Sequence, residues 1–582
     1  MRRELLTRQG DARSAELGQY LFVQALIREV SYNTLSRKDR KTRHLAAARF
    51  FEQLDSDELA SALAGHYLAA HANAAEGPEQ DALAAQARVA LKAAAERASR
   101  LGAYDQAVQF LQQALSVTME SRDRAELLER ASEFAGIASK HSLAVQLARD
   151  AIDAHKESGD RLGEARATSA LGWVMLNARY DTDALELLKA AVTQFADLDD
   201  PLILADMKVN LARAWNQFER VEGESRALAL SDEALLVAEH GNHPKLLVKG
   251  LLNKGVALGG QGRLREAIAL IGAGGDLARE HGLTEQLLAS LTVRGYYLGE
   301  VDNEEAYRCF LEGLDLARRV GHRALTREFV NNVGYTSFLT GDWERGLAEL
   351  DATLEEDLET TGRIWLMSNQ LIIRASRGDP IDEPLAQLDH LATQVPEPHV
   401  LTAPHDTHGN YAQAQGRFAD AQRHWLAVAA AWPSQAPASY YQAARPALWS
   451  GDLAAVEQNS ADLDATGVHG PVVEARRSNL RAAIAALEGR SRDAVALYGD
   501  AFAAWGNLKV AWEQALTGVD MATVLDPTEP AVAAAIKTSR EILSRLGAKP
   551  YLERLEAAAA RAGGASRVGT GRKAEALAVE TA

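Results

Sequence analysis

Turns that begin with glycine recur along this sequence at a nearly constant spacing of 35 to 38 residues. The five most regular are Gly341-Asp342, Gly378-Asp379, Gly416-Arg417, Gly451-Asp452 and Gly489-Arg490. Each interval has room for two helices of about 12–15 residues joined by a tight turn. Glycine suits such a turn because it adopts the positive φ that ends a helix. The chain is therefore expected to be all-α and built from helical hairpins.

Small residues also recur in pairs seven positions apart. The pairs include Ala184/Ala191, Ala227/Ala234, Ala267/Gly274, Ala421/Val428 and Ala494/Ala501. Residues at i and i+7 share one helix face, where small side chains let a second helix approach closely. Large residues four positions after the first member, such as Leu188, Ile271 and Trp425, are expected to fill the gap between neighbouring hairpins.

The units resemble tetratricopeptide repeats. The matching residues are Leu171-Gly172, Ala184, Leu188 and Ala191; Gly255, Ala267, Ile271 and Gly274; and Gly334, Gly341, Trp343 and Gly346. Comparable units recur about eleven times between residues 88 and 525. The resemblance implies a tetratricopeptide-repeat α-solenoid, a right-handed superhelix of about eleven hairpins with a concave inner face.

Composition excludes several function classes. With 63 Lys and Arg against 80 Asp and Glu, the formal net charge is −17, which argues against a nucleic-acid-binding surface. Cys309 is the only cysteine, so neither an internal disulfide nor a thiolate metal site is expected. No apolar run is long enough to span a membrane, and the first 20 residues lack the apolar core of a signal peptide. We therefore expect a cytoplasmic protein with no membrane partner.

The N-terminal segment follows a different pattern. It contains the string Phe22-x-x-Ala25-Leu26-Ile27-x-Glu29-Val30-x-Tyr32, then a basic stretch over residues 37–44. Residues 20–70 resemble the junction between an AAA/STAND-type ATPase and its repeat array in large bacterial proteins of the adenylate/guanylate cyclase type. The P-loop string G-x-x-x-x-G-K-[ST] and the paired aspartates of a cyclase are missing from this sequence. ATP binding and cyclase activity therefore belong to parts of that family that this sequence does not contain.

These observations predict four regions. Residues 1–80 form a helical junction, 81–525 the repeat array, 526–562 a pair of closing helices and 563–582 a disordered tail. The leading hypothesis is a non-catalytic scaffold that binds a protein or peptide and regulates an ATPase or cyclase module in cis or in trans. The alternative is the C-terminal part of a cyclase or ATP-dependent transcription regulator, and self-association is a weaker third possibility. No catalytic residue and no cofactor or metal site is predicted.

The resemblance also suggests which residues would hold a peptide. In the longer variant of the repeat, an Asn two residues before the small packing residue lines the concave groove, where a carboxamide can both donate to and accept from a peptide backbone. That position is filled here by Asn210, Asn253 and Asn332. Helical spacing places Arg213, Asn216, Tyr296, Asn331 and Tyr335 on the same face. The competing interpretation is that these asparagines bond neighbouring helix ends.

Two His-x-x-His strings are the other candidates for chemistry. His405 and His408 form one, and His240 and His243 the other. Zinc needs three or four ligands and no third one stands near either pair, so solvated loop histidines are expected. Cys309 lies in a predicted helix beside Phe310, which favours a buried, inert thiol.

Overall fold

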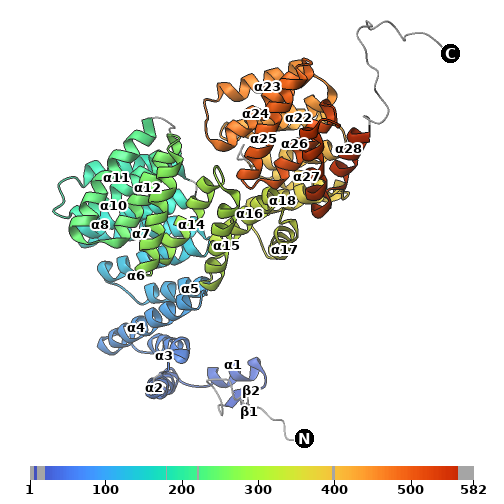
Figure 1. The fold of residues 1–582 in the computed structure, drawn as a ribbon. Helices are drawn as coiled ribbons and strands as arrows, with labels where there is room; N and C mark the ends of the chain where they lie inside the picture. The colour runs from blue at the N-terminus through green and yellow to red at the C-terminus, as the bar shows by residue number, and fades with distance from the viewer. Residues whose placement is uncertain are drawn as a thin grey trace, which may run out of the picture. The chain divides into compact units, whose positions relative to one another are not determined.

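The computed structural model describes residues 6–8, 20–54, 56–178, 180–218, 222–395 and 400–560. The predicted disordered tail, 563–582, lies outside the described residues. Apart from one short β-ribbon, the described part is helical, and consecutive helices pack as antiparallel hairpins (Figure 1). The predicted all-α solenoid of tetratricopeptide-type hairpins is confirmed.

The chain divides into two compact units, each described here by itself. The N-terminal unit comprises the described residues of Met1–Ser290 and Asp315–Thr326. Its elements are β1 (Leu6–Arg8), β2 (Tyr20–Phe22), α1 (Ala25–Asn33), α2 (Arg37–Gln53), a 3₁₀ turn (Asp57–Leu59), α3 (Ala60–Ala72), α4 (Pro78–Arg100), α5 (Tyr104–Ser116), α6 (Ser121–Ile137), α7 (His141–Ser158), α8 (Arg161–Asn177), α9 (Asp181–Gln194), α10 (Pro201–Phe218), α11 (Glu222–Gly241), α12 (Pro244–Gly260) and α13 (Leu264–Glu280).

The C-terminal unit comprises the described residues of Leu291–Leu314 and Arg327–Ala582, so the division runs through three helices, α14 (Thr284–Leu298), α15 (Asn303–Arg319) and α16 (Arg323–Thr340). The remaining elements are α17 (Trp343–Leu354), α18 (Thr360–Arg377), α19 (Asp382–Ala392), α20 (Thr402–Ala414), α21 (Phe418–Ala431), α22 (Ala436–Ser450), α23 (Leu453–Ala465), α24 (Pro471–Leu487), α25 (Ser491–Asn507), α26 (Ala511–Val524), α27 (Pro530–Leu546) and α28 (Lys549–Ala560).

Glycine does two jobs in these hairpins. At turns it takes a positive φ, as Gly378 and Gly451 do directly after α18 and α22. Inside the first helix of a hairpin it makes room for a large residue of the second helix. A Cβ placed on Gly172 would lie 2.5 Å from a methyl carbon of Leu188, and one on Gly255 would lie 2.6 Å from a side-chain carbon of Ile271. The expectation that these large residues fill the gap between hairpins is therefore wrong, because they pack within their own hairpin.

The N-terminal unit is closed by a contact between two turns far apart in the sequence. Gly102 in the α4–α5 turn meets Gly321 in the α15–α16 turn, and a Cβ placed on Gly321 would lie 2.7 Å from the Gly102 Cα. Both glycines have positive φ. Beside them, Arg323 forms a 3.3 Å ion pair with Asp105. The solenoid thus returns to its own earlier turn through backbone contact at glycine.

The C-terminal unit is closed by side chains. The Asn303 amide donates to the Leu508 carbonyl across 3.0 Å, and Arg545 donates to the Gly341 carbonyl across 2.9 Å. Trp512 of α26 packs on Phe338, Trp343 and Tyr551, with ring centroids 4.9 to 5.3 Å apart. The last helices therefore pack back against the first ones of this unit.

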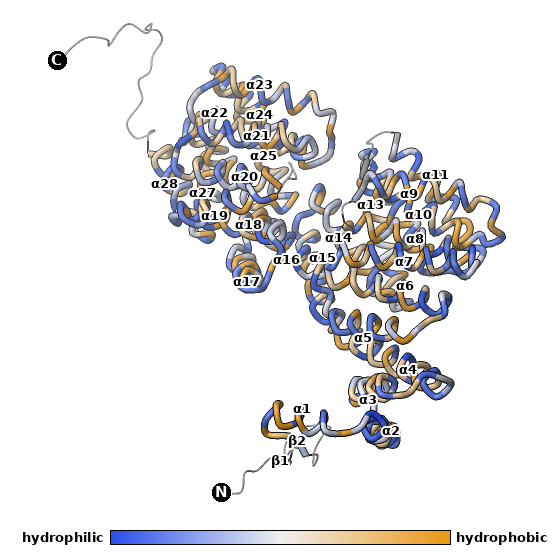
Figure 2. Tube along the Cα trace, turned by 180° about the vertical axis from the view of Figure 1, so that it is seen from behind, coloured by the Kyte–Doolittle hydropathy of each residue, from blue (hydrophilic) through white to orange (hydrophobic). Residues whose placement is uncertain are grey.

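The N-terminal segment differs from the rest of its unit. β1 and β2 pair antiparallel, with Leu6 opposite Phe22, so the start of the string predicted as helical is extended. α1 has no buried residue, and its Leu26 and Val30 are 69% and 57% exposed. Figure 2 shows α1 as a largely hydrophobic segment. No helix in the described ranges has both the length and the apolar content needed to cross a bilayer.

Candidate functional site

The predicted groove residues fall into two sets, one in each unit. Asn210, Arg213, Asn216 and Asn253 belong to the N-terminal unit, whereas Tyr296, Asn331, Asn332 and Tyr335 belong to the C-terminal unit. Each set lies on consecutive first helices of its hairpins, α10 and α12 in one unit and α14 and α16 in the other. The residues therefore form two separate candidate walls.

In the N-terminal unit the carboxamides tie successive helices together. The Asn210 Nδ2 donates to the Ser169 carbonyl of α8 across 3.2 Å, and the side chain is 1% exposed. The Asn253 Nδ2 donates to the Val209 carbonyl, and Asn216 donates back to the Asn253 carbonyl across 3.1 Å. These contacts are of the kind that the competing interpretation expects, and peptide binding at these positions stays a prediction.

The charged groups of this wall have partners as well. The Arg213 guanidinium lies 4.2 Å from the Trp173 ring centroid and donates to Asn177. Lys249 forms a 2.6 Å ion pair with Asp206. Burial alone would raise the pKa of Asp206, but the charge and hydrogen bond of Lys249 hold that pKa below its usual value. The wall of the N-terminal unit is thus internally compensated.

In the C-terminal unit the same ties leave two tyrosines open. The Asn332 Nδ2 donates to the Tyr296 hydroxyl, and Asn369 of α18 donates to the Asn331 Oδ1 across 2.9 Å. Tyr296 and Tyr335 remain 51% and 48% exposed. Burial raises the pKa of Tyr335, and the charges of Arg476 and Asp406 act on its hydroxyl. Four helices of this unit, α16, α18, α20 and α24, therefore present polar or aromatic groups to one wall.

Sequence reasoning missed Asp406 and Arg476 as members of this wall. The signal was present, because Gly409 precedes its turn at Gly416 by seven residues, as Gly334 precedes Gly341. That register places Asp406 three residues before the packing glycine, on the side of α20 where groove residues are sought. The His-Asp-Thr-His string had been interpreted only as a metal motif.

The histidines of that string are not in a loop, so that expectation is wrong. His405 and His408 lie on α20, and both are half-buried. The His405 and His424 Nδ1 atoms are 2.9 Å apart, and the His408 Nε2 lies 3.0 Å from Asp389. Burial, with the neighbouring histidines, lowers the pKa of His424 to about 4. Within the described ranges no group of three or more His, Cys, Asp and Glu could hold a metal ion.

The other string, His240 and His243, borders the turn between α11 and α12. His240 lies in the last turn of α11, and its Nδ1 is 2.7 Å from the Leu236 carbonyl oxygen. His243 is the residue that precedes α12. Both occupy a hairpin turn, as the spacing predicts.

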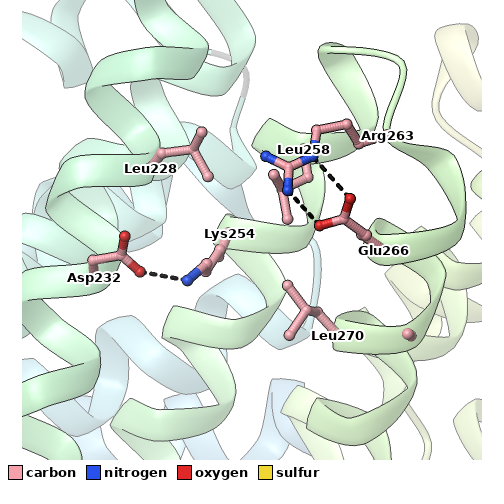
Figure 3. A pocket seen from close by; sticks show the side chains of 8 residues that line it. Leu228, Asp232, Lys254, Leu258, Arg263, Glu266 and Leu270 are labelled. Carbon is pink, nitrogen blue, oxygen red and sulfur yellow. Dashed lines mark hydrogen bonds and ion pairs between the residues drawn. The ribbon is translucent and has the colours of Figure 1, made fainter.

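An open pocket lies among α11, α12 and α13 of the N-terminal unit (Figure 3). Its lining includes Leu228, Leu258 and Leu270. Its charged groups are consumed by internal ion pairs, Lys254 with Asp232 across 2.6 Å and Arg263 with Glu266. The pocket therefore offers a ligand mainly leucine side chains.

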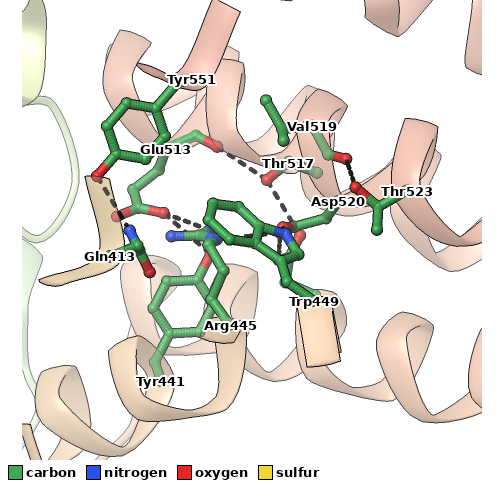
Figure 4. Close-up of polar contacts among 11 residues, drawn as sticks. Gln413, Tyr441, Arg445, Trp449, Glu513, Thr517, Val519, Asp520, Thr523 and Tyr551 are labelled. Carbon is green, nitrogen blue, oxygen red and sulfur yellow. Dashed lines mark hydrogen bonds and ion pairs between the residues drawn. The ribbon is translucent and has the colours of Figure 1, made fainter. Parts of the chain in front are cut away.

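A network of buried charges joins α22, α24 and α26 (Figure 4). The Arg445 guanidinium donates to Glu513 across 2.8 Å and to Asp520 across 3.1 Å, and it is 4% exposed. Trp449 and Asn479 also donate to Asp520. Because every partner lies within the network, it holds the three helices together and faces no opening.

The sequence matches no protein-family model and no curated protein. Among solved structures, it is similar to a Rap protein complexed with competence and sporulation factor, at 14% identity and a TM-score of 0.40 over 68% of this chain and 98% of that one. A STAND protein with a tetratricopeptide repeat sensor from Pyrococcus horikoshii matches at 12% identity and a TM-score of 0.31, over 60% of this chain and 56% of its own. Yeast Tom70 matches at 14% identity and a TM-score of 0.32, over 77% and 99%. With TM-scores this low, nothing about the activity or partners of this chain follows from these likenesses.

Proposed function

We propose that this chain is a non-catalytic scaffold that binds a peptide or a protein segment on the inner wall of its C-terminal unit. The observation that carries the proposal is the pair Tyr296 and Tyr335, which stay about half exposed on a wall whose other side chains are tied together. Exposed tyrosines on a rigid, preorganised helical surface supply contact area at low entropic cost.

We further propose that binding regulates an ATPase or nucleotide cyclase module, joined to this chain or separate from it. The support is the apolar surface of the N-terminal segment, where Phe22, Val23, Leu26 and Val30 are 39% to 69% exposed. Exposed apolar side chains that gather in one segment mark an interaction site more often than scattered ones do. Such a module, docked on α1, would receive the signal from the repeat array.

Peptide binding is tested by panning the full chain against a displayed random-peptide library and measuring the affinity of the enriched peptides. Tyr335→Ala should weaken that affinity at least tenfold, and Tyr180→Ala is the matched control, because Tyr180 is 43% exposed in the N-terminal unit. Failure to enrich any sequence, or equal affinity for both variants, would remove the proposed function.

The alternative, part of an enzyme whose ATP-binding domain lies elsewhere in the polypeptide, is favoured by the same exposed α1. Leu26→Asp with Val30→Asp should abolish association with an ATPase or cyclase expressed alongside it, measured as nucleotide turnover in the purified complex. Turnover that persists in the double variant would exclude α1 as the docking surface.

A further inference from the structure

Tyr335 lies between two ionisable groups of opposite charge in the C-terminal unit. Asp406 of α20 and Arg476 of α24 both act electrostatically on the Tyr335 hydroxyl of α16. Charge acts on the pKa of a group only over short distances, so these side chains face one shared space on the wall. Glu300, which follows α14, also acts on the same hydroxyl.

Asp406 has no partner for its carboxylate among the described residues. The neighbouring Asn410 donates to the Asp406 backbone carbonyl and leaves the side chain unbonded. Other aspartates around it are satisfied, since Asp389 pairs with His408 and Asp420 with Arg417. Burial raises the pKa of Asp406 to about 7, and no neighbouring charge offsets that effect. A half-buried carboxylate without a counter-charge is costly to the fold, and such costs concentrate at functional sites.

Arg476 is likewise without an ion pair in the described part of the chain. The adjacent Arg477 is the opposite case, because it bonds Asp464, Glu474 and the Val468 carbonyl. Two neighbouring arginines on one helix are therefore treated differently. One is consumed by the fold, and the one that acts on Tyr335 is left open.

We propose that this wall binds an extended peptide that places a lysine or arginine side chain against Asp406 and a carboxylate against Arg476, on opposite sides of Tyr335. This inference rests on the proposed function and adds the charge pattern of the ligand. The basic side chain gains a charge-assisted hydrogen bond to a carboxylate that the fold leaves unpaired. Tyr335 contributes its ring face, which attracts a cation, and Glu300 adds a second negative charge on this wall.

The proposal predicts a specific dependence on pH. Because the pKa of Asp406 is about 7 in the free protein, affinity for a basic peptide should be about tenfold lower at pH 6 than at pH 8. The other ionisable groups near α20 are His405 and His408 on the helix itself, Asp389 on α19 and His424 on α21. Asp406→Asn removes the carboxylate and leaves these groups in place, so it should abolish most of the pH dependence.

The test uses the full chain and an array of octapeptides of alanine and tyrosine in which Lys, Arg, Gln, Asp or Glu occupies each position in turn and in pairs. Peptides with one basic and one acidic residue should bind best. Asp406→Asn should weaken the basic peptides at least tenfold, and Arg476→Gln should weaken the acidic ones similarly. The control Asp500→Asn, at an exposed position of α25, should change neither.

The outcomes separate this inference from the proposed function. If peptides bind without regard to charge, or bind Asp406→Asn as tightly as the native chain, the charge pattern is wrong and peptide binding stands. If no peptide of any composition binds, both fail. Because Asp406→Asn removes an unpaired half-buried charge, its melting temperature at pH 8 should not fall, so lost affinity cannot be ascribed to unfolding.

Discussion

The two units close by different means. In the N-terminal unit, turns more than 200 residues apart meet backbone to backbone at Gly102 and Gly321, and the ion pair beside them is exposed. In the C-terminal unit, aromatic rings around Trp512 and the buried Arg445 network join the first and last helices. Closure by glycine depends on shape alone, whereas closure by buried charge depends on every partner being present.

The walls differ in the same sense. Asp206 in the N-terminal unit is neutralised by Lys249, but Asp406 in the C-terminal unit has no counter-charge. A compensated wall adds to stability, and an uncompensated one sacrifices some of it for binding. The comparison therefore locates the binding surface in the unit that is more strongly closed.

The largest expected effect is on the charge network. Arg445→Met leaves Glu513 and Asp520 buried without a counter-charge and should destabilise the fold by about 3–5 kcal/mol. Urea denaturation followed by circular dichroism measures it. Arg490→Met, which removes an exposed ion pair in the same unit, should leave the midpoint almost unchanged. Equal effects of the two variants would show that the network does not close the unit.

Gly321→Ala tests closure of the N-terminal unit. The new Cβ would meet the Gly102 backbone, and alanine is strained at this positive φ, so a loss of about 2–3 kcal/mol is expected. Gly282→Ala is the matched control, because Gly282 has a similar φ with nothing within 4 Å of the added Cβ. The difference between the two variants isolates the turn-to-turn contact, and a difference near zero would contradict it.

Two aspartate substitutions should have opposite signs at pH 8. Asp206→Asn leaves Lys249 without its partner and should destabilise by about 1–2 kcal/mol. Asp406→Asn should stabilise by about 1–2 kcal/mol, because a folded pKa of about 7 means that the ionised form costs stability above that pH. Below pH 4, where both carboxyls are protonated, the gain should vanish. Thermal melts at pH 4 and pH 8 measure both changes, and two losses at pH 8 would refute the contrast.

The smallest effect concerns His424. Its pKa in the folded state, about 4, lies below the unfolded value near 6.5, so the folded state binds fewer protons in that interval. Stability should therefore fall by about 1 kcal/mol as the pH drops from 6.5 to 4, and His424→Gln should flatten that loss. An unchanged acid slope in the variant would show that the histidine pair is not its source.

Much of the fold follows from the sequence, because small residues at helical spacing permit only one kind of packing. Ala184, Ala421 and Ala494 are fully buried, as their spacing predicts. Cys309 is 4% exposed, and burial raises the pKa of its thiol to about 11, in keeping with an inert residue. These outcomes depend on local helix geometry, which short-range patterns encode.

The closing contacts and the charge pattern of the wall could not be predicted in this way. Gly102 and Gly321 carry the same turn signal as glycines that touch nothing. Arg476 and Arg477 are adjacent and chemically identical, yet only Arg477 finds acidic partners. Which of them stays open depends on where the superhelix returns to itself, and that is set by small rotations summed over many hairpins.

Native-state hydrogen exchange, compared between Gly321→Ala and Arg445→Met, tests most directly whether the two units are closed by separate devices. We predict faster exchange in α4, α5 and the α15–α16 turn for Gly321→Ala, and in α22, α24 and α26 for Arg445→Met. The same pattern of acceleration in both variants, spread over both units, would contradict the account.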